Sequence, residues 1–164
     1  MKQKVVFCIR AITGEGGGAE RVFAQVVNAL RHRGKQVQVL AFDTQARPFY
    51  DLEQTPVSFL SILRPNRSMG LIQFVRLLFR IRDYLRRERP QVVVAFMHSA
   101  YIPILIASLG LKIRVIASEH ADYGLYKSKV LQGWINTFFC RLAWKKTVPS
   151  ESQLPYYSAA EQKK

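Results

Sequence analysis

Cysteine and acidic residues are scarce in this 164-residue chain. Its two cysteines, Cys8 and Cys140, lie far apart in apolar segments, and no Cys or His pair has zinc-site spacing. Only 11 Asp and Glu oppose 25 Lys and Arg, which leaves a net charge of +14. Internal repeats, low-complexity tracts and the cleavage site of a signal peptide are lacking as well. We therefore expect one globular domain over residues 1–164, with buried thiols and anionic partners.

Long uncharged runs are rare, and one of them has the length of a membrane span. Residues 91–111, QVVVAFMHSAYIPILIASLGL, contain no formal charge. His98, Ser99, Tyr101 and Pro103 interrupt this run. Because a buried parallel strand followed by a buried helix gives the same pattern, we favour strand plus helix over a membrane span.

Strand-like apolar runs alternate with helix-like segments along the chain. Strands are predicted at residues 4–9, 37–42, 56–60, 91–96, 112–118 and 146–150. Helices are predicted at residues 19–33, 70–88, 101–109 and 127–145. The alternation indicates an α/β fold, a Rossmann-like open parallel sheet with helices on both faces. We expect the strand order 3-2-1-4-5-6, which has its switch point between the first and fourth strands.

The predicted core faces of two helices can be read from their apolar spacing. For residues 70–88 the expected core-facing residues are Leu71, Phe74, Val75, Leu78, Ile81 and Leu85. For residues 127–145 they are Trp134, Phe138 and Leu142.

Arginines gather on the opposite face of the helix predicted at residues 70–88. Arg76, Arg80 and Arg87 share this face, and Ile72 and Phe79 flank them. A basic amphipathic helix with apolar flanks suits an anionic membrane surface. A solvated helix face and a nucleic-acid surface are the alternatives, although no nucleic-acid-binding motif is present, so nucleic acid is an unlikely partner.

A glycine-rich stretch, GEGGGAER at residues 14–21, follows the first predicted strand. The expected topology brings it to one crevice with residues 98–101 and 119–124, at the carboxyl ends of the strands. Backbone N–H groups at a helix N-terminus can bind a phosphate or sugar oxygen, and glycines leave room for it. The alternative is a tight strand-to-helix turn.

A dinucleotide-dependent oxidoreductase is a second interpretation of the same glycines. Gly14, Gly16 and Ala19 match G-x-G-x-x-A, and Asp43 follows the second strand where a ribose-binding acid is expected. The spacing argues against this function. In the dinucleotide-binding motif the first glycine follows the strand almost at once, whereas here residues 10–13 separate the strand from the first glycine. A non-catalytic basic module that binds nucleic acid or membrane is a third interpretation.

The first 42 residues resemble a known enzyme family. VVFCIRAITGEGGGAERVFAQVVNALRHRGKQVQVLAF is similar to the opening of family-4 retaining glycosyltransferases, in which G-G-A-E-R-V precedes a helix and R-G-H-x-V. Here Gly17–Val22 match the first motif, and Lys35 replaces the usual histidine of the second. RPQVVVAFMHS, VIASEHAD and VPSESQ resemble three further strand ends of that family, so the resemblance covers nearly the whole chain.

The resemblance implies the N-terminal, acceptor-side half of a two-domain GT-B enzyme. Such enzymes transfer a sugar from a nucleotide-diphosphate donor with retention and without a metal, so no cofactor or metal ligand is expected. The matching positions that would bind the donor are Gly16, Gly17, Gly18 and Glu20. Those that would bind the acceptor are His98, Ser99, Glu119 and His120, and His98 is also the candidate catalytic residue.

Each of these polar residues also has a purely structural interpretation. His98 suits a hydrogen-bonded core position, His120 a surface position, and Glu119 an ion pair with Arg114 or Lys127. Glu20 and Arg21 suit the first turn of a helix, where a carboxylate balances the helix dipole.

The length of the chain differs from the family pattern. Nothing resembles the C-terminal nucleotide-binding half, so that half is the expected partner and the isolated chain is expected to have little turnover. A sugar or lipid-linked acceptor and an anionic membrane surface are the other expected partners. The expected setting is the cytoplasmic face of a bacterial plasma membrane, in cell-surface glycan or glycolipid synthesis.

Overall fold

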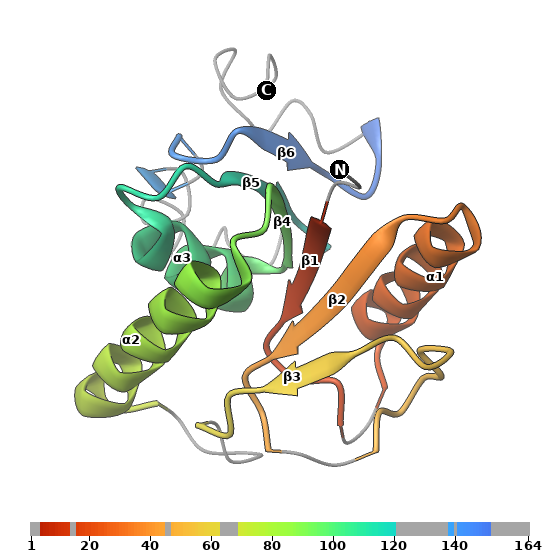
Figure 1. Ribbon diagram of the computed structural model, residues 1–164, viewed down its shortest axis with the longest axis horizontal. Coiled ribbons are helices and arrows are strands. Elements are labelled where there is room, and N and C mark those ends of the chain that lie inside the picture. The colour runs from red at the N-terminus through yellow and green to blue at the C-terminus, as the bar shows by residue number, and fades with distance from the viewer. Residues whose placement is uncertain are drawn as a thin grey trace.

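A single parallel sheet organises the structure. The computed structural model describes residues 4–13, 16–44, 47–62, 69–120, 138–139 and 141–151, and within these ranges six strands pair in the order β3-β2-β1-β4-β5-β6 (Figure 1). The strands are β1 (Lys4–Ile9), β2 (Gln36–Ala41), β3 (Val57–Phe59), β4 (Val92–Phe96), β5 (Arg114–Ser118) and β6 (Lys145–Thr147). The predicted α/β class and strand order are confirmed.

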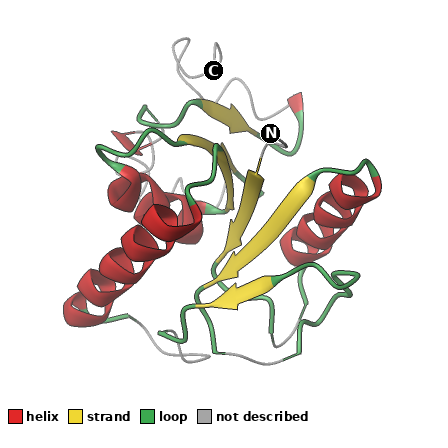
Figure 2. Cartoon of the chain, in the orientation of Figure 1, coloured by secondary structure: helices red, strands yellow, loops and turns green. Residues whose placement is uncertain are grey.

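Helices cover both faces of this sheet (Figure 2). They are α1 (Gly18–His32), α2 (Leu71–Glu88) and α3 (His98–Ser108). Figure 1 shows α1 on one side of the sheet and α2 with α3 on the other. Gly34 follows α1 with a φ of +71°, the left-handed conformation that commonly ends a helix.

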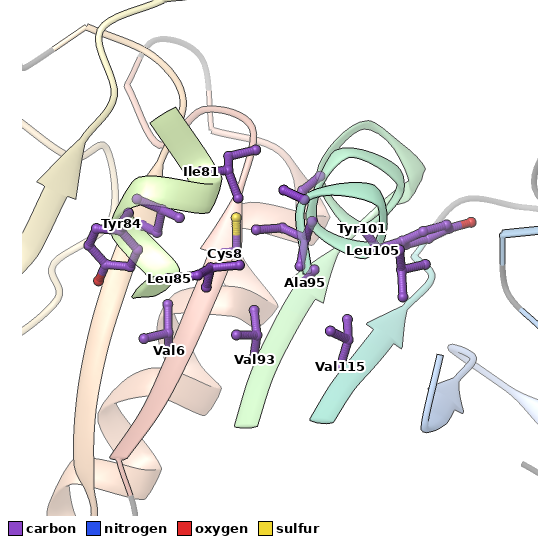
Figure 3. Close-up of a cluster of buried hydrophobic side chains, with 14 of the residues drawn as sticks. Val6, Cys8, Ile81, Tyr84, Leu85, Val93, Ala95, Tyr101, Leu105 and Val115 are labelled. Carbon is purple, nitrogen blue, oxygen red and sulfur yellow. The ribbon is translucent and has the colours of Figure 1, made fainter. Parts of the chain in front are cut away.

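Alternate residues of the strands supply two separate cores. On the α1 side, Phe7 and Phe96 pack against Phe23 of α1. On the α2 and α3 side, Cys8 lies among Ile81, Leu85 and other apolar side chains (Figure 3). Cys8 is a free, buried thiol as expected, and burial raises its pKa. Cys140 lies outside the described residues.

The core face of α2 matches the predicted one only in part. Ile81 and Leu85 are buried as predicted, and Leu78 packs partly buried against the same core. Leu77 and Tyr84 are buried as well, whereas Leu71 and Val75, expected in the core, are 78% and 42% exposed. Tyr84 buries its ring in the core, and its hydroxyl donates a hydrogen bond to Oε1 of Gln38 on β2. The helix is therefore rotated relative to the prediction, and its first two turns expose apolar side chains.

Residues 91–111 form a strand and a helix, as the sequence analysis favoured. β4 ends at Phe96 and α3 begins at His98, three residues before the predicted start, so His98 and Ser99 lie in its first turn rather than in a loop. Among the described helices, none combines the length and the apolar character that a membrane crossing requires.

The helix predicted at residues 127–145 is wrong at its C-terminal end. Residues 141–142 form a turn, and Lys145 already belongs to β6. Phe138 and Leu142, expected in the core, are 62% and 46% exposed. Trp134 lies outside the described residues.

Candidate functional site

The three segments expected to form the crevice all follow strands at the carboxyl edge of the sheet. β1 is hydrogen-bonded to β4, and β4 to β5, all in parallel. The segments that follow these three strands therefore leave the sheet at the same edge. Between β4 and α3 the chain turns sharply at Met97, whose φ is +65° and whose N–H donates to the carbonyl of Ser118.

Asp43 holds the segment that leads from β1 toward the glycines. This residue is 3% exposed. Its Oδ2 accepts hydrogen bonds from the backbone N–H of Ile12 at 3.0 Å and from both the N–H and the hydroxyl of Thr13 at 3.1 and 2.7 Å. The Asp43 carboxylate is thus directed to the β1–α1 connection. Its other oxygen, Oδ1, is buried without a hydrogen-bond partner among the described residues, so a ribose could reach it only if the groups that cover it moved.

The three described glycines of the loop have different surroundings. A Cβ on Gly16 would lie 2.2 Å from Cδ1 of Phe49, so the glycine allows this aromatic side chain to pack against the loop. A Cβ on Gly17 would meet only the Glu20 carboxylate, and one on Gly18 would meet nothing within 4 Å. Open space is therefore found at Gly18, whereas the Glu20 carboxylate lies against Gly17. Gly14 lies outside the described residues.

Glu20 forms a cap for the first turn of α1. Its Oε2 accepts a hydrogen bond from the N–H of Gly17 at 3.1 Å. A carboxylate at this position also opposes the positive end of the helix dipole. The same N–H group is one that an incoming phosphate oxygen would use, so Glu20 and an anionic ligand compete for it. Donor binding by these four residues stays a prediction.

His98 and Ser99 lie in the first turn of α3, both half-buried. They follow β4, the strand that neighbours β1, which places them at the same sheet edge as the glycine loop. Their role in binding an acceptor stays a prediction.

Glu119 is a buried carboxylate at the end of β5, only 2% exposed. It accepts hydrogen bonds from the hydroxyl of Tyr101 at 2.9 Å and from the backbone N–H of His120 at 3.0 Å. Figure 3 shows the Tyr101 hydroxyl directed away from the aliphatic cluster. Arg114, proposed as an ion-pair partner, instead lies over the ring of Trp144, 4.9 Å from its centroid. Lys127 lies outside the described residues.

The imidazole ring of His120 is held by a ring stack and a hydrogen bond. Its ring stacks on Phe96 with a centroid separation of 4.6 Å and an interplanar angle of 5°. Its Nε2 lies 2.9 Å from Oγ of Ser118, and the hydroxyl of Thr147 donates to the same Oγ at 2.7 Å. Burial lowers the pKa of His120 below 6.5, and the nearby Glu119 carboxylate opposes this shift.

Several residues of this site were missed by sequence reasoning. Asp43 was considered only as a ribose ligand, while Ser118 and Thr147 were not considered as site residues. Ser118 and Thr147 are paired by the register of β5 and β6, and this register is not visible in the sequence. Within the described residues, no three His, Cys, Asp or Glu side chains lie close enough to bind a metal together.

The arginine face predicted on α2 is only partly available. Arg80 donates a hydrogen bond to the carbonyl of Leu60, and Arg87 pairs with Asp83 at 3.5 Å. Beside Arg76 on the outward side, Leu71, Ile72 and Phe79 are 78%, 72% and 69% exposed. We call these four residues the α2 outer face.

A hollow lies beside the β1–α1 segment. It measures about 670 Å³ and is lined by residues of the connection between β2 and β3 and by Val57, the first residue of β3. The N–H of Phe49 donates to the carbonyl of Ile12 at 2.8 Å. The first part of this connection therefore packs against the β1–α1 segment.

Comparison with known proteins identifies similar enzymes. The profile of Glycosyltransferase Family 4 matches residues 16–158. A relative from Campylobacter jejuni, the GalNAc-alpha-(1->4)-GalNAc-alpha-(1->3)-diNAcBac-PP-undecaprenol alpha-1,4-N-acetyl-D-galactosaminyltransferase, is 29% identical over 129 residues. That alignment covers 77% of this chain and 35% of the relative.

Solved structures with the same fold include transferases and epimerases. The lipopolysaccharide outer core galactosyltransferase WaaB superposes with a TM-score of 0.71 at 15% identity, covering 98% of this chain and 44% of WaaB. MurG of Acinetobacter baumannii gives 0.61 at 20% identity, covering 89% and 41%. A UDP-GlcNAc 2-epimerase from Methanocaldococcus jannaschii gives 0.66 at 12% identity, covering 98% and 44%.

These likenesses agree with the observed fold. The neighbours WaaB and MurG show the Rossmann-like architecture of GT-B glycosyltransferases. This chain spans 35% to 44% of the lengths of the relatives described above. Because the family profile matches most of the residues, the chain belongs to Glycosyltransferase Family 4.

Proposed function

We propose that this chain is the N-terminal, acceptor-binding half of a retaining glycosyltransferase of bacterial cell-surface glycan or glycolipid synthesis. The C-terminal half of the GT-B fold would bind the nucleotide-diphosphate sugar, and the glycine loop would close over the donor. The isolated chain would then have little or no turnover, because half of the donor site is contributed by the other domain. No metal is expected in this reaction.

One observation supports this proposal above the others. The glycine loop after β1 and the polar group formed by His98, Glu119 and His120 leave neighbouring parallel strands at the same edge. This edge is where ligands bind in open α/β sheets. The backbone N–H groups at the exposed Gly17 and Gly18 suit phosphate oxygens once a ligand displaces Glu20 from Gly17. Imidazole and carboxylate groups suit the hydroxyls of an acceptor sugar.

The geometry also favours this function over a dinucleotide-dependent one. A ribose-binding acid after β2 must have a carboxylate that is available to the ribose hydroxyls. In this chain Oδ2 of Asp43 already accepts three hydrogen bonds from Ile12 and Thr13. Its Oδ1 is free of hydrogen bonds among the described residues but is buried as well, so the carboxylate supports the loop and is covered from an approaching ribose.

The donor and acceptor assignments can be tested by ligand titration of the ¹⁵N-labelled chain. The probes are UDP-N-acetylhexosamines, short-chain prenyl-diphosphate-linked glycans, and NAD with NADP as competitors. We expect amide shifts at Gly17, Gly18, His98 and His120 with the glycan probes. Shifts at these residues with NAD but not with the glycans would contradict the proposal.

A matched pair of histidine substitutions separates site contacts from general effects. His98→Ala is expected to weaken glycan binding roughly two- to twelvefold, since one hydrogen bond contributes about 0.5–1.5 kcal/mol. His32→Ala is the control, because His32 lies at the end of α1 with a 70% exposed side chain that pairs with Glu53. Equal effects of both substitutions would exclude a specific role for His98.

Peripheral membrane binding is the second part of the proposal, and the α2 outer face supports it. Its exposed Leu71, Ile72 and Phe79 lie beside Arg76, and the whole chain has a net charge of +14. Apolar side chains enter the headgroup region of a bilayer while arginines bind anionic lipid. An anionic bilayer is therefore the occupant that both the charge and the apolar surface favour.

Vesicle sedimentation tests this membrane contact. We expect the chain to sediment with vesicles that contain phosphatidylglycerol, and much less with pure phosphatidylcholine. Phe79→Ser should weaken binding about tenfold or more, because a buried Phe side chain contributes about 1.5–3 kcal/mol. Val26→Ser is the control, since Val26 is 37% exposed on α1, across the sheet. Unchanged binding of the Phe79 variant would refute the assignment.

A further inference from the structure

We infer that Ser118 and Thr147 are positioning residues that fix the His120 ring in one tautomer, with its proton on Nδ1. In this form His120 presents a fixed N–H donor to an acceptor oxygen of the substrate, a sugar hydroxyl or a phosphate oxygen. The substrate contact rests on the function proposed above. The tautomer does not rest on it, and it can be measured independently.

Three side chains from adjacent segments form an unbroken hydrogen-bonded series. Thr147, the last residue of β6, donates from Oγ1 to Oγ of Ser118 at 2.7 Å. Ser118, the last residue of β5, lies with the same Oγ 2.9 Å from Nε2 of His120. The parallel register pairs Ser118 directly with Thr147, so the sheet itself sets the distance between the two hydroxyls.

The direction of donation along this series sets which ring nitrogen is protonated. A hydroxyl has one proton to donate and can accept through its lone pairs. When Thr147 donates to Ser118, the remaining proton of Ser118 points to Nε2, which must then be the unprotonated nitrogen. With Thr147 as the donor, the opposite tautomer would place two donors on the same Oγ and leave the proton of Ser118, which is only 4% exposed, without an acceptor in this series. A reversed series, in which Nε2–H donates to Ser118 and Ser118 donates to Thr147, fits the same distances. It is the alternative that the spectra described below distinguish.

The orientation of the ring is also fixed by contacts outside the series. Phe96 of β4 stacks against the imidazole at 4.6 Å with the two rings 5° from parallel. The backbone N–H of His120 donates to Oε1 of Glu119 at 3.0 Å. With Nε2 directed to Ser118 and one ring face covered, Nδ1 is the ring nitrogen that the described side chains leave for a ligand.

The charge state of the ring agrees with this assignment. Burial lowers the pKa of His120 below 6.5, so the neutral ring predominates at neutral pH. Glu119 is the charged group that acts against this shift. The side chains that contact the ring from the adjoining strands, Phe96 and Ser118, are uncharged. A neutral donor does not hold an anionic product as strongly as an imidazolium would, which favours turnover.

Long-range ¹H–¹⁵N correlation spectra of the labelled chain at pH 8 test the tautomer directly. We expect a pyrrole-type signal for Nδ1 of His120 and a pyridine-type signal for Nε2, assigned by loss in His120→Gln. Ser118→Ala should lose the Nδ1–H form in favour of Nε2–H, the form that a free histidine side chain prefers. Thr147→Val should give a mixture of the two forms, while Ser118→Thr keeps a hydroxyl and should retain the parent signals.

The parent spectrum alone can overturn the inference. A pyrrole-type Nε2 in the unaltered chain would show that Ser118 accepts from the ring, and the proposed series would be reversed. Unchanged ring signals in Ser118→Ala and Thr147→Val would show that the hydroxyls only stabilise the fold. The signals of His32 should not change in any variant. Failure of glycan binding with the predicted tautomer intact would refute the proposed function and leave the tautomer assignment standing.

Discussion

Replacing Asp43 with alanine tests how the glycine loop is held at the crevice. The substitution removes the acceptor of three hydrogen bonds, from the N–H groups of Ile12 and Thr13 and from the Thr13 hydroxyl. Ile12 is 6% exposed, so its N–H has little access to water. Leaving one buried donor without a partner costs about 1–3 kcal/mol, and the partly accessible Thr13 groups cost less.

We therefore expect Asp43→Ala to lower the free energy of unfolding by about 2–4 kcal/mol. For a chain of this size the midpoint of thermal unfolding should fall by roughly 4–16 °C. Urea denaturation measures the first quantity and calorimetry the second. Amide hydrogen exchange at Ile12 and Thr13 should become faster than in the strands, because the loop loses its support.

Two further variants make this test specific. Asp43→Asn keeps an acceptor oxygen and the side-chain shape, so we expect a loss of only about 1 kcal/mol, the contribution of a typical hydrogen bond. Asp83→Ala removes an exposed ion pair with Arg87 and should change stability by less than about 0.5 kcal/mol. A loss in Asp43→Ala no larger than that of Asp83→Ala, with unchanged exchange at Ile12 and Thr13, would refute the reasoning.

Two other outcomes are expected. Gly16→Ala should displace Phe49 and destabilise the fold, because the new Cβ would lie 2.2 Å from the Phe49 ring. Gly18→Ala has open space around its Cβ and should stabilise α1 by up to about 0.5–1 kcal/mol. Thermal unfolding compares the two variants, and equal losses of stability would contradict this view of the loop. The lowered pKa of His120 means that below pH 6.5 the unfolded chain binds a proton that the folded chain does not, so stability should fall with acidification from 6.5 toward the lower folded pKa. His120→Gln should lose less stability over that interval in urea titrations, and an identical slope would show that His120 does not contribute.

The sheet could be predicted because its strands are short apolar runs with few alternatives. Val92, Val93 and Val94 are consecutive apolar residues, which is typical of a strand buried on both faces. The rotation of α2 could not be predicted in the same way. Apolar residues occupy more than half of its circumference, and the choice between Leu71 and Tyr84 as core residues depends on the shape of the sheet and of α3.

The candidate site was predicted where a motif points to it and missed where register creates it. Gly17, Gly18, His98 and Glu119 follow strands, so topology alone assembles them at one edge. The pairing of Ser118 with Thr147 requires the alignment of β5 with β6, and nothing in the residues between them indicates that alignment. The loop-holding role of Asp43 was missed because its position also fits a nucleotide-binding acid.

The two cores described above support different parts of the crevice. The ring of His120 stacks on Phe96, which packs edge-to-face against Phe23 of α1 with centroids 5.1 Å apart. Tyr101, the hydrogen-bond partner of Glu119, belongs to the other core, beneath α2 and α3. Packing changes under α1 should therefore disturb the imidazole and spare the carboxylate, and changes under α3 should do the reverse. Because the two cores are separate, substitutions in one core could change the position of His120 during evolution, for example to accept a different sugar, without moving Glu119.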